Sequence, residues 1–226
     1  MIYESSRVAM KAALEKIRDY TQQHAELLKS HHFLFNAPLN GPINNADVVI
    51  IGLNPGETAS DWLYEGSTPT EESSEYDFHS DSFRGKSSNR WITLCNEYLP
   101  NSRIVLSEFF FWSSSDIKSG FRDRFGYSFK KCPHLEFCKE LNSELVLFHR
   151  PKLIVSTGTF WAEFMAKKYD LDHVTTLNCE SDERQRRIIV HYEWQSIPFI
   201  FTPHWTSGFV SKAEKQEIKS YLSDFL

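Results

Sequence analysis

The sequence predicts an α/β fold: a three-layer α/β/α arrangement around a central, mostly parallel, four-stranded sheet. Short apolar runs rich in β-branched residues alternate along the chain with longer segments of helical periodicity. The runs lack the alternation of a half-exposed strand, which is typical of strands buried on both faces of a parallel sheet. At 226 residues, we expect one domain over residues 1–226.

The first element is an amphipathic helix over residues 4–30, expected to pack on the domain. Its apolar positions lie on one stripe: Val8, Leu14, Ile17, Leu27 and Leu28. Residues 47–53, DVVIIGL, then form a buried strand that ends at Asn54, Pro55 and Gly56. The polar segment 57–86 follows and predicts a long surface excursion.

The remaining elements alternate in the same way. Strands are predicted at 103–112, 152–156, 188–194 and 197–202, and helices at 89–99, at 135–148 and around Trp161 and Phe164. A last helix begins where Ser211 and Glu214 form a capping-box pattern.

Composition narrows the class of protein. Hydrophobic residues make up 41% of the chain, yet no apolar run approaches the ~20 residues of a membrane span, and residues 1–30 lack the apolar centre of a secretion signal. We therefore expect a cytoplasmic monomer with no membrane association. Four scattered cysteines favour reduced thiols. Cys132, His134 and Cys138 lack a fourth ligand and close pairing, so we expect no metal and no cofactor.

The formal net charge of −5 argues against nucleic-acid binding by bulk charge, but it leaves room for a local basic face. Such clusters are more often solvated surface than binding sites. Three basic groups stand out: Arg84, Lys86 and Arg90; Lys118, Arg122 and Arg124; and Arg184, Arg186 and Arg187.

Ligands of parallel sheets bind beyond the carboxyl ends of the strands. Four segments are predicted to meet there: 54–57, 107–111, 157–159 and 202–207. The turn from Gly52 to Gly56 has neither the three glycines of a dinucleotide fingerprint nor the Gly-Lys-Ser/Thr ending of a phosphate loop. A G-x-S-x-G nucleophile elbow is also absent from the sequence.

Residues 48–56, VVIIGLNPG, resemble the first motif of the uracil-DNA glycosylase superfamily, in the form found in its mismatch-specific and single-strand-selective branches. Three further segments resemble the family in the same order along the chain. They are the aromatic-Asn-Pro-Leu segment at 35–39, the strand-Gly-helix unit at 153–162, and Thr202-Pro203-His204 in place of the late His-Pro-Ser-Pro motif. The resemblance covers residues 33–226 and implies the glycosylase fold.

The resemblance also implies roles for individual residues. Asn54 would orient the attacking water, and His204 would hydrogen-bond the oxyanion that develops on the departing base. Gly52, Leu53, Pro55, Gly56, Phe83, Glu108 and Phe109 would surround the base, and Gly158, Thr159, Trp205, Thr206 and Ser207 would contact the DNA. Without the family, Asn54 is a turn residue, His204 is a partly buried loop histidine, and any one aromatic is more often core.

Two positions depart from the family pattern. Glu108 stands where most members have an Asn that reads the uracil edge, and an ionised carboxylate can only accept hydrogen bonds, which suits a base that presents an amino group. His204-Trp205-Thr206-Ser207 lacks the prolines of the late motif, so we expect a wedge loop with Trp205 at its tip.

The sequence thus predicts a monofunctional DNA glycosylase that hydrolyses the N-glycosidic bond of uracil or another deaminated or modified base flipped out of single- or double-stranded DNA. The alternatives are a protein of the same fold that binds a nucleotide or damaged strand without cutting it, and a hydrolase of free nucleosides or RNA.

Overall fold

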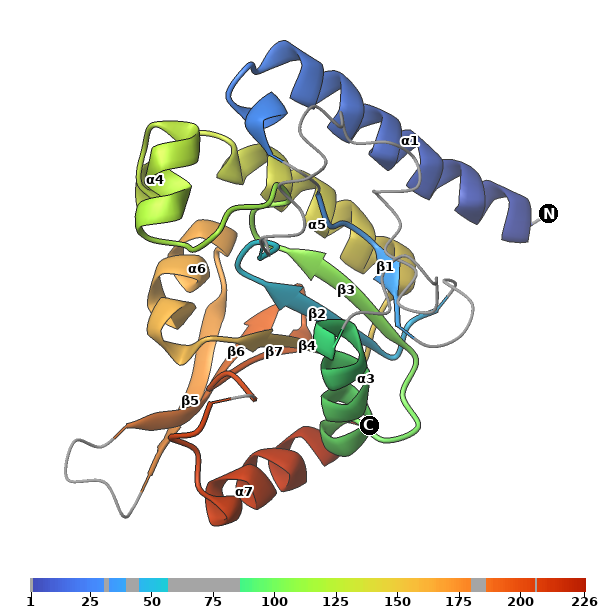
Figure 1. The fold of residues 1–226 in the computed structure, drawn as a ribbon. Coiled ribbons are helices and arrows are strands. Elements are labelled where there is room, and N and C mark those ends of the chain that lie inside the picture. Colours follow the sequence, from blue (N-terminus) through green and yellow to red (C-terminus); the bar gives the residue numbers. More distant parts are fainter. Residues whose placement is uncertain (1, 31–32, 40–44, 57–85, 180–185, 206) are drawn as a thin grey trace.

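A seven-stranded sheet forms the centre of the computed structural model (Figure 1). The structure describes residues 2–30, 33–39, 45–56, 86–179, 186–205 and 207–226. For residues 2–11, 38 and 86–91 it describes only the backbone. The strand order is β1-β3-β2-β4-β7-β6-β5. Four neighbouring strands are mutually parallel: β3 (Ile104–Glu108), β2 (Val48–Gly52), β4 (Leu153–Thr157) and β7 (Ile197–Thr202). The prediction of a mostly parallel sheet is confirmed, whereas the prediction of four strands is wrong.

Antiparallel strands at both edges account for the difference. The two-residue strand β1 (Ala37–Pro38) pairs with β3, and β6 (Arg187–Trp194) pairs with both β7 and β5 (Asp172–Asn178). Gln195 and Ser196, the two residues between β6 and β7, both have positive φ, at 53° and 64°. A two-residue turn of this kind matches the twist of an antiparallel hairpin, so β6 folds back beside β7.

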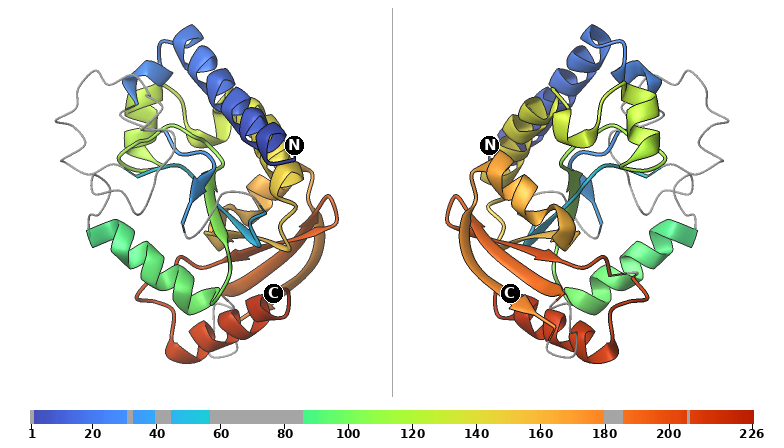
Figure 2. Two further views of the ribbon diagram at one scale, coloured as in Figure 1. Left: turned by 90° about the vertical axis from the view of Figure 1, so that its right-hand side faces the viewer. Right: turned by 90° about the vertical axis from the view of Figure 1, so that its left-hand side faces the viewer.

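Helices cover both faces of the sheet (Figure 2). One face carries α1 (Ile2–Gln23), α4 (Ser119–Phe125), α5 (Leu135–His149) and α6 (Ala162–Tyr169), and the other carries α3 (Lys86–Tyr98) and α7 (Lys212–Ser223). Successive residues of β2 alternate between the two cores: Val49 and Ile51 belong to the first, and Val48 and Ile50 to the second. The layers are therefore α/β/α.

Several predicted elements have shorter or shifted bounds. The helix expected over 4–30 ends at Gln23 and is followed by the short 3₁₀ helix η1 (Leu27–Lys29), and β3 covers only the first half of the predicted strand 103–112. The capping box of α7 is present, because the Ser211 side chain accepts from the Glu214 backbone and the Glu214 side chain accepts from the Ser211 backbone. None of the helices in the described part is long and apolar enough to cross a membrane.

The four cysteines are buried free thiols. His134, which lies between Cys132 and Cys138, contacts Tyr20 Oη through Nδ1 at 3.0 Å and Glu26 Oε1 through Nε2 at 3.1 Å. Both of its ring nitrogens are thus engaged by protein groups. Within the described ranges, no three His, Cys, Asp or Glu residues are grouped as metal ligands.

Candidate functional site

The turn after β2 stays close to the chain that follows β3. Gly52 is in register with Glu108, and its carbonyl accepts from the Phe109 backbone at 2.9 Å. A Cβ at Gly52 would collide with the Glu108 carboxyl, so glycine is required for this close approach. Gly56 forms an isolated parallel bridge with Ser114, which fixes the far end of the turn.

The Asn54 side chain is oriented by two acceptors. Its Nδ2 donates to the Pro55 carbonyl at 3.1 Å and to Ser114 Oγ at 2.8 Å, and Ser114 Oγ donates onward to the Asp116 carbonyl at 3.0 Å. The Pro55 carbonyl can only accept, and the Ser114 hydroxyl already donates its hydrogen to the Asp116 carbonyl. Both groups therefore require a donor, so the amide nitrogen of Asn54 must face them. Asn54 Oδ1 is left as an acceptor on a half-buried side chain, with no donor from the described residues.

Glu108 is the buried acid of the site. It is 9% exposed, and burial raises the pKa of its carboxyl well above the usual value. Its Oε2 has no hydrogen-bond partner among the described residues, while its backbone carbonyl accepts from Asn142 Nδ2 at 2.8 Å. Desolvation disfavours the ionised, acceptor-only Glu108 that the sequence analysis expected, and it favours the protonated acid, which donates through O–H and accepts through C=O.

The carboxyl ends of β4 and β7 lie beside those of β2 and β3 at the same end of the sheet. Thr157 is paired with Thr202, and the Gly158 backbone donates to the Thr202 carbonyl at 2.7 Å. Gly158 has φ of 147°, in the region open to glycine, and Thr159 begins the short helix η5 (Thr159–Trp161). This geometry turns the chain sharply away from the strand end.

His204 lies on the loop after β7. It is exposed, and its backbone carbonyl accepts from the Ser207 backbone at 2.8 Å, which closes the turn. Strand β4 lies between β2 and β7. The turns that carry Asn54 and His204 are therefore separated by one strand, and both lie at the carboxyl ends of the parallel strands.

Two aromatic residues are core residues instead of binding residues: Trp205, expected to contact the DNA, and Phe109, expected to surround the base. Trp205 is 2% exposed, stacks on Tyr98 with ring centroids 4.6 Å apart, and donates from Nε1 to Thr202 Oγ1 at 3.0 Å. It cannot be the exposed tip of a wedge, because its ring fills the core under α3 and α7. Phe109 is fully buried and packs edge-on against Tyr169, so it does not face a base.

In the loop between β7 and α7, the exposed large apolar side chain among the described residues is Phe209, at 87% exposure. Ser207, two residues earlier, is half-buried. Phe83 and Thr206, which were also predicted at the site, lie outside the described residues.

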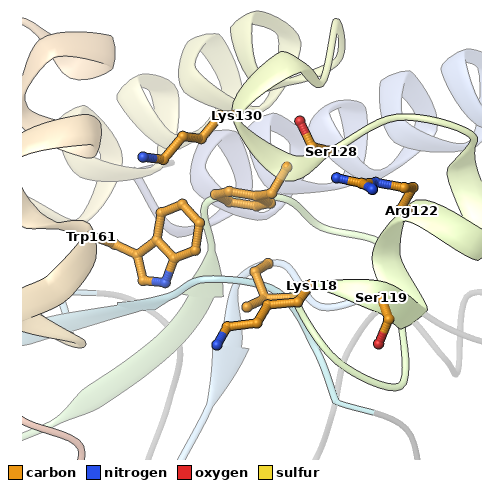
Figure 3. Close-up of a pocket in the computed structure, with 8 residues that line it drawn as sticks. Lys118, Ser119, Arg122, Ser128, Lys130 and Trp161 are labelled. Carbon is orange, nitrogen blue, oxygen red and sulfur yellow. The ribbon is translucent and has the colours of Figure 1, made fainter.

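A cavity of about 360 Å³ lies on the α4 side of this edge (Figure 3). Its lining combines apolar and basic side chains with two hydroxyls: Ile117, Lys118, Ser119, Arg122, Ser128, Phe129, Lys130 and Trp161. Sequence reasoning singled out Lys118 and Arg122 as basic residues, but it did not identify the cavity or the role of Ser114. The only local signal for the cavity was the basic spacing near residue 120.

No protein-family model matches this chain, and no curated protein is significantly similar to it in sequence.

Proposed function

We propose that this chain is a DNA glycosylase-like hydrolase of the uracil-DNA glycosylase fold, which cleaves the N-glycosidic bond of a base flipped out of DNA. The observation that supports this best is the fixed Asn54 amide at the carboxyl end of β2. Its nitrogen is held by Ser114 and Pro55, which leaves Oδ1 to accept a hydrogen from a water molecule. A water held in this way keeps a lone pair available for attack on the sugar carbon.

The second requirement of the reaction is stabilisation of the departing base. Breaking the bond builds positive charge on the sugar and negative charge on the base, so a donor near the base oxygen lowers the barrier. His204 is the candidate donor, on the loop after β7 at the same edge as Asn54. Removal of one such donor typically lowers the rate ~10²–10³-fold.

Glu108 supports a revised view of the base. A protonated carboxyl offers one donor and one acceptor, which matches the N3–H and O4 edge of uracil as well as bases that carry an amino group. Uracil is therefore a substrate candidate on equal terms with deaminated purines. Glu108→Gln retains a donor and an acceptor and should retain most of the activity, whereas Glu108→Leu removes both and should abolish discrimination between bases.

The decisive experiment measures release of free base from single- and double-stranded oligonucleotides that carry uracil, hypoxanthine, xanthine or a modified pyrimidine. Wild type is compared with Asn54→Ala and His204→Ala. The matched controls are Asn178→Ala and His173→Ala on the exposed edge strand β5. Release that both site variants lose and both controls keep would support the proposal.

Two other outcomes would contradict it. Release unaffected by Asn54→Ala and His204→Ala would point to a contaminating activity or a different site. No release from any oligonucleotide, together with tight binding of one of them, would favour the non-catalytic strand-binding protein.

A further inference from the structure

The cavity beside the Asn54 turn has the composition of an anion site with an apolar floor. We define the basic cavity by Lys118, Ser119, Arg122, Phe129, Lys130 and Trp161, together with Ile117 and Ser128. In Figure 3, Trp161 and Arg122 lie on opposite sides, and the Arg122 guanidinium points toward the space between them. A volume near 360 Å³ is at the lower end of the range for small-molecule sites, roughly 300–1,000 Å³.

The cationic side chains of the basic cavity are not neutralised by acidic partners from the described residues. Lys118, Arg122 and Lys130 form no ion pair within this part of the chain, unlike Lys16, Lys139 or Lys219. Three positive charges around one hollow, without an acidic partner among the described residues, are unexpected in a chain of net charge −5. They favour a ligand that carries negative charge.

One carboxylate, that of Asp116, lies at the margin of the cavity, and it is already engaged. Asp116 Oδ1 accepts from the Lys118 backbone at 2.7 Å, and Oδ2 accepts from the Gly120 backbone at 3.0 Å and Ser119 Oγ at 3.1 Å. These bonds hold the start of α4 rather than a cation. Counted over the described residues, the cavity keeps a net positive charge after the single negative charge of Asp116 is included.

The floor of the basic cavity is aromatic. Phe129 is 2% exposed and meets the half-buried Trp161 edge to face, with ring centroids 5.2 Å apart. Lys130 Nζ lies 5.6 Å from the centre of the Trp161 ring, so a positive charge is held at the rim of the aromatic surface. A ligand with both a flat ring and an anionic group fits this pairing better than a bare anion does.

The basic cavity adjoins the candidate site. A Cβ at Gly158 would lie 3.9 Å from Trp161 Cδ1 and 4.0 Å from Leu53 Cδ1, so the wall of the cavity and the Asn54 turn meet at Gly158. On the other side, Ile117 directly follows Asp116, whose carbonyl accepts from the Ser114 hydroxyl that positions Asn54.

We infer that the basic cavity binds a nucleotide, with its phosphate between Lys118, Arg122 and Ser119 and its base or sugar on Phe129 and Trp161. The site goes beyond the proposed hydrolysis, because it requires neither Asn54 nor His204. Free mononucleotide and a nucleotide unit within a DNA strand share this chemistry.

The test is titration of the purified chain with dTMP, thymidine and a labelled eight-residue oligo-dT, by calorimetry or fluorescence anisotropy. Arg122→Gln combined with Lys130→Gln removes two charges from the cavity. Lys212→Gln combined with Lys215→Gln removes the same charge from α7, on the opposite face of the sheet. Trp161→Phe tests the ring, and thermal melts establish that each variant is folded.

Two results together would support the inference. Binding is saturable and its affinity falls by about tenfold or more in the cavity double variant, and the affinity of the α7 double variant stays within about twofold of wild type. For the oligonucleotide, the dependence of log K on log salt should also become shallower by about 0.7 for each phosphate interaction that the variant removes. Binding of dTMP identifies a free-nucleotide site, and binding of the oligonucleotide alone identifies a strand subsite.

Equal weakening by the two double variants would reduce the effect to bulk charge and overturn the inference. Thymidine binding as tightly as dTMP would overturn the phosphate assignment, and no saturable binding of either dTMP or the oligonucleotide would overturn the site. The titration does not measure base release, so failure of this inference leaves the proposed hydrolysis to be judged by its own assay.

Discussion

Glu108→Gln should make the protein more stable at neutral pH, and the gain should disappear in acid. In the folded chain, burial raises the pKa of the Glu108 carboxyl well above 4.5, whereas the unfolded chain exposes the same group to water. As pH rises above about 4.5, the unfolded chain releases a proton that the folded chain keeps, so the free energy of unfolding of the wild type falls. A glutamine has no proton to release, so the variant avoids this loss.

The magnitude follows from the linkage. While the buried carboxyl stays protonated, each pH unit lowers the stability of the wild type by about 1.4 kcal/mol relative to the variant. For each such pH unit, the difference between the two melting temperatures of a chain of this size should change by roughly 3–6 °C.

The assay is thermal or urea unfolding of both proteins from pH 4.5 to pH 8, with Glu217→Gln as the control. Glu217 lies on α7 with its side chain in solvent, so Glu217→Gln is the same replacement at the surface. Parallel stability curves for wild type and Glu108→Gln from pH 5 to pH 7 would refute the reasoning. They would mean that Glu108 is ionised and compensated in the folded chain.

Three further outcomes are expected. Trp205→Ala should lower the free energy of unfolding by about 3–5 kcal/mol in urea titrations, because its ring stacks on Tyr98 in the core, whereas Phe209→Ala should change it by less than about 0.5 kcal/mol. Burial lowers the pKa of His149 to about 4. As pH drops from 6.5 to 4, the unfolded chain takes up a proton that the folded chain excludes, so the free energy of unfolding should fall by about 3 kcal/mol. Unfolding curves of His149→Gln should lack this loss. Ser114→Ala should lower kcat for base release about tenfold with KM nearly unchanged, because Asn54 loses its positioning partner; an unchanged kcat would contradict the role of Ser114.

The elements that the sequence predicted well are those whose pattern is local. The apolar runs of β2, β4 and β7 indicated buried parallel strands because both of their faces are covered by helices. The capping box located the start of α7 from two residues. Strand β5 was missed because Asp172–Asn178 is a mostly exposed, polar edge strand, whose pairing with β6 leaves no apolar signature.

The errors at the candidate site concern contacts that are distant in sequence. Trp205 follows His204 in a loop motif, and only its stacking on Tyr98, more than a hundred residues earlier, places it in the core. Arg124 was grouped with Lys118 and Arg122, but its Nη1 donates to the Lys29 carbonyl at 2.6 Å. Lys130 contributes to the basic cavity instead, from the short helix η4 (Phe129–Lys131).

The pleat of the sheet would allow its carboxyl end to carry both kinds of binding group that we propose. Glu108 lies two residues beyond Leu106, so its side chain is on the face covered by α3 and α7. The basic cavity is on the opposite face, where Phe129 and Trp161 pack with α4 and α6. Under the two proposals, a DNA strand that passed the Asn54 turn would present a neutral base edge to Glu108 and a charged phosphate to Arg122. Glu108→Leu should lose discrimination between bases with its oligonucleotide affinity unchanged. The cavity double variant should lose oligonucleotide affinity and keep discrimination between bases. These two results together would demonstrate that the two faces act separately.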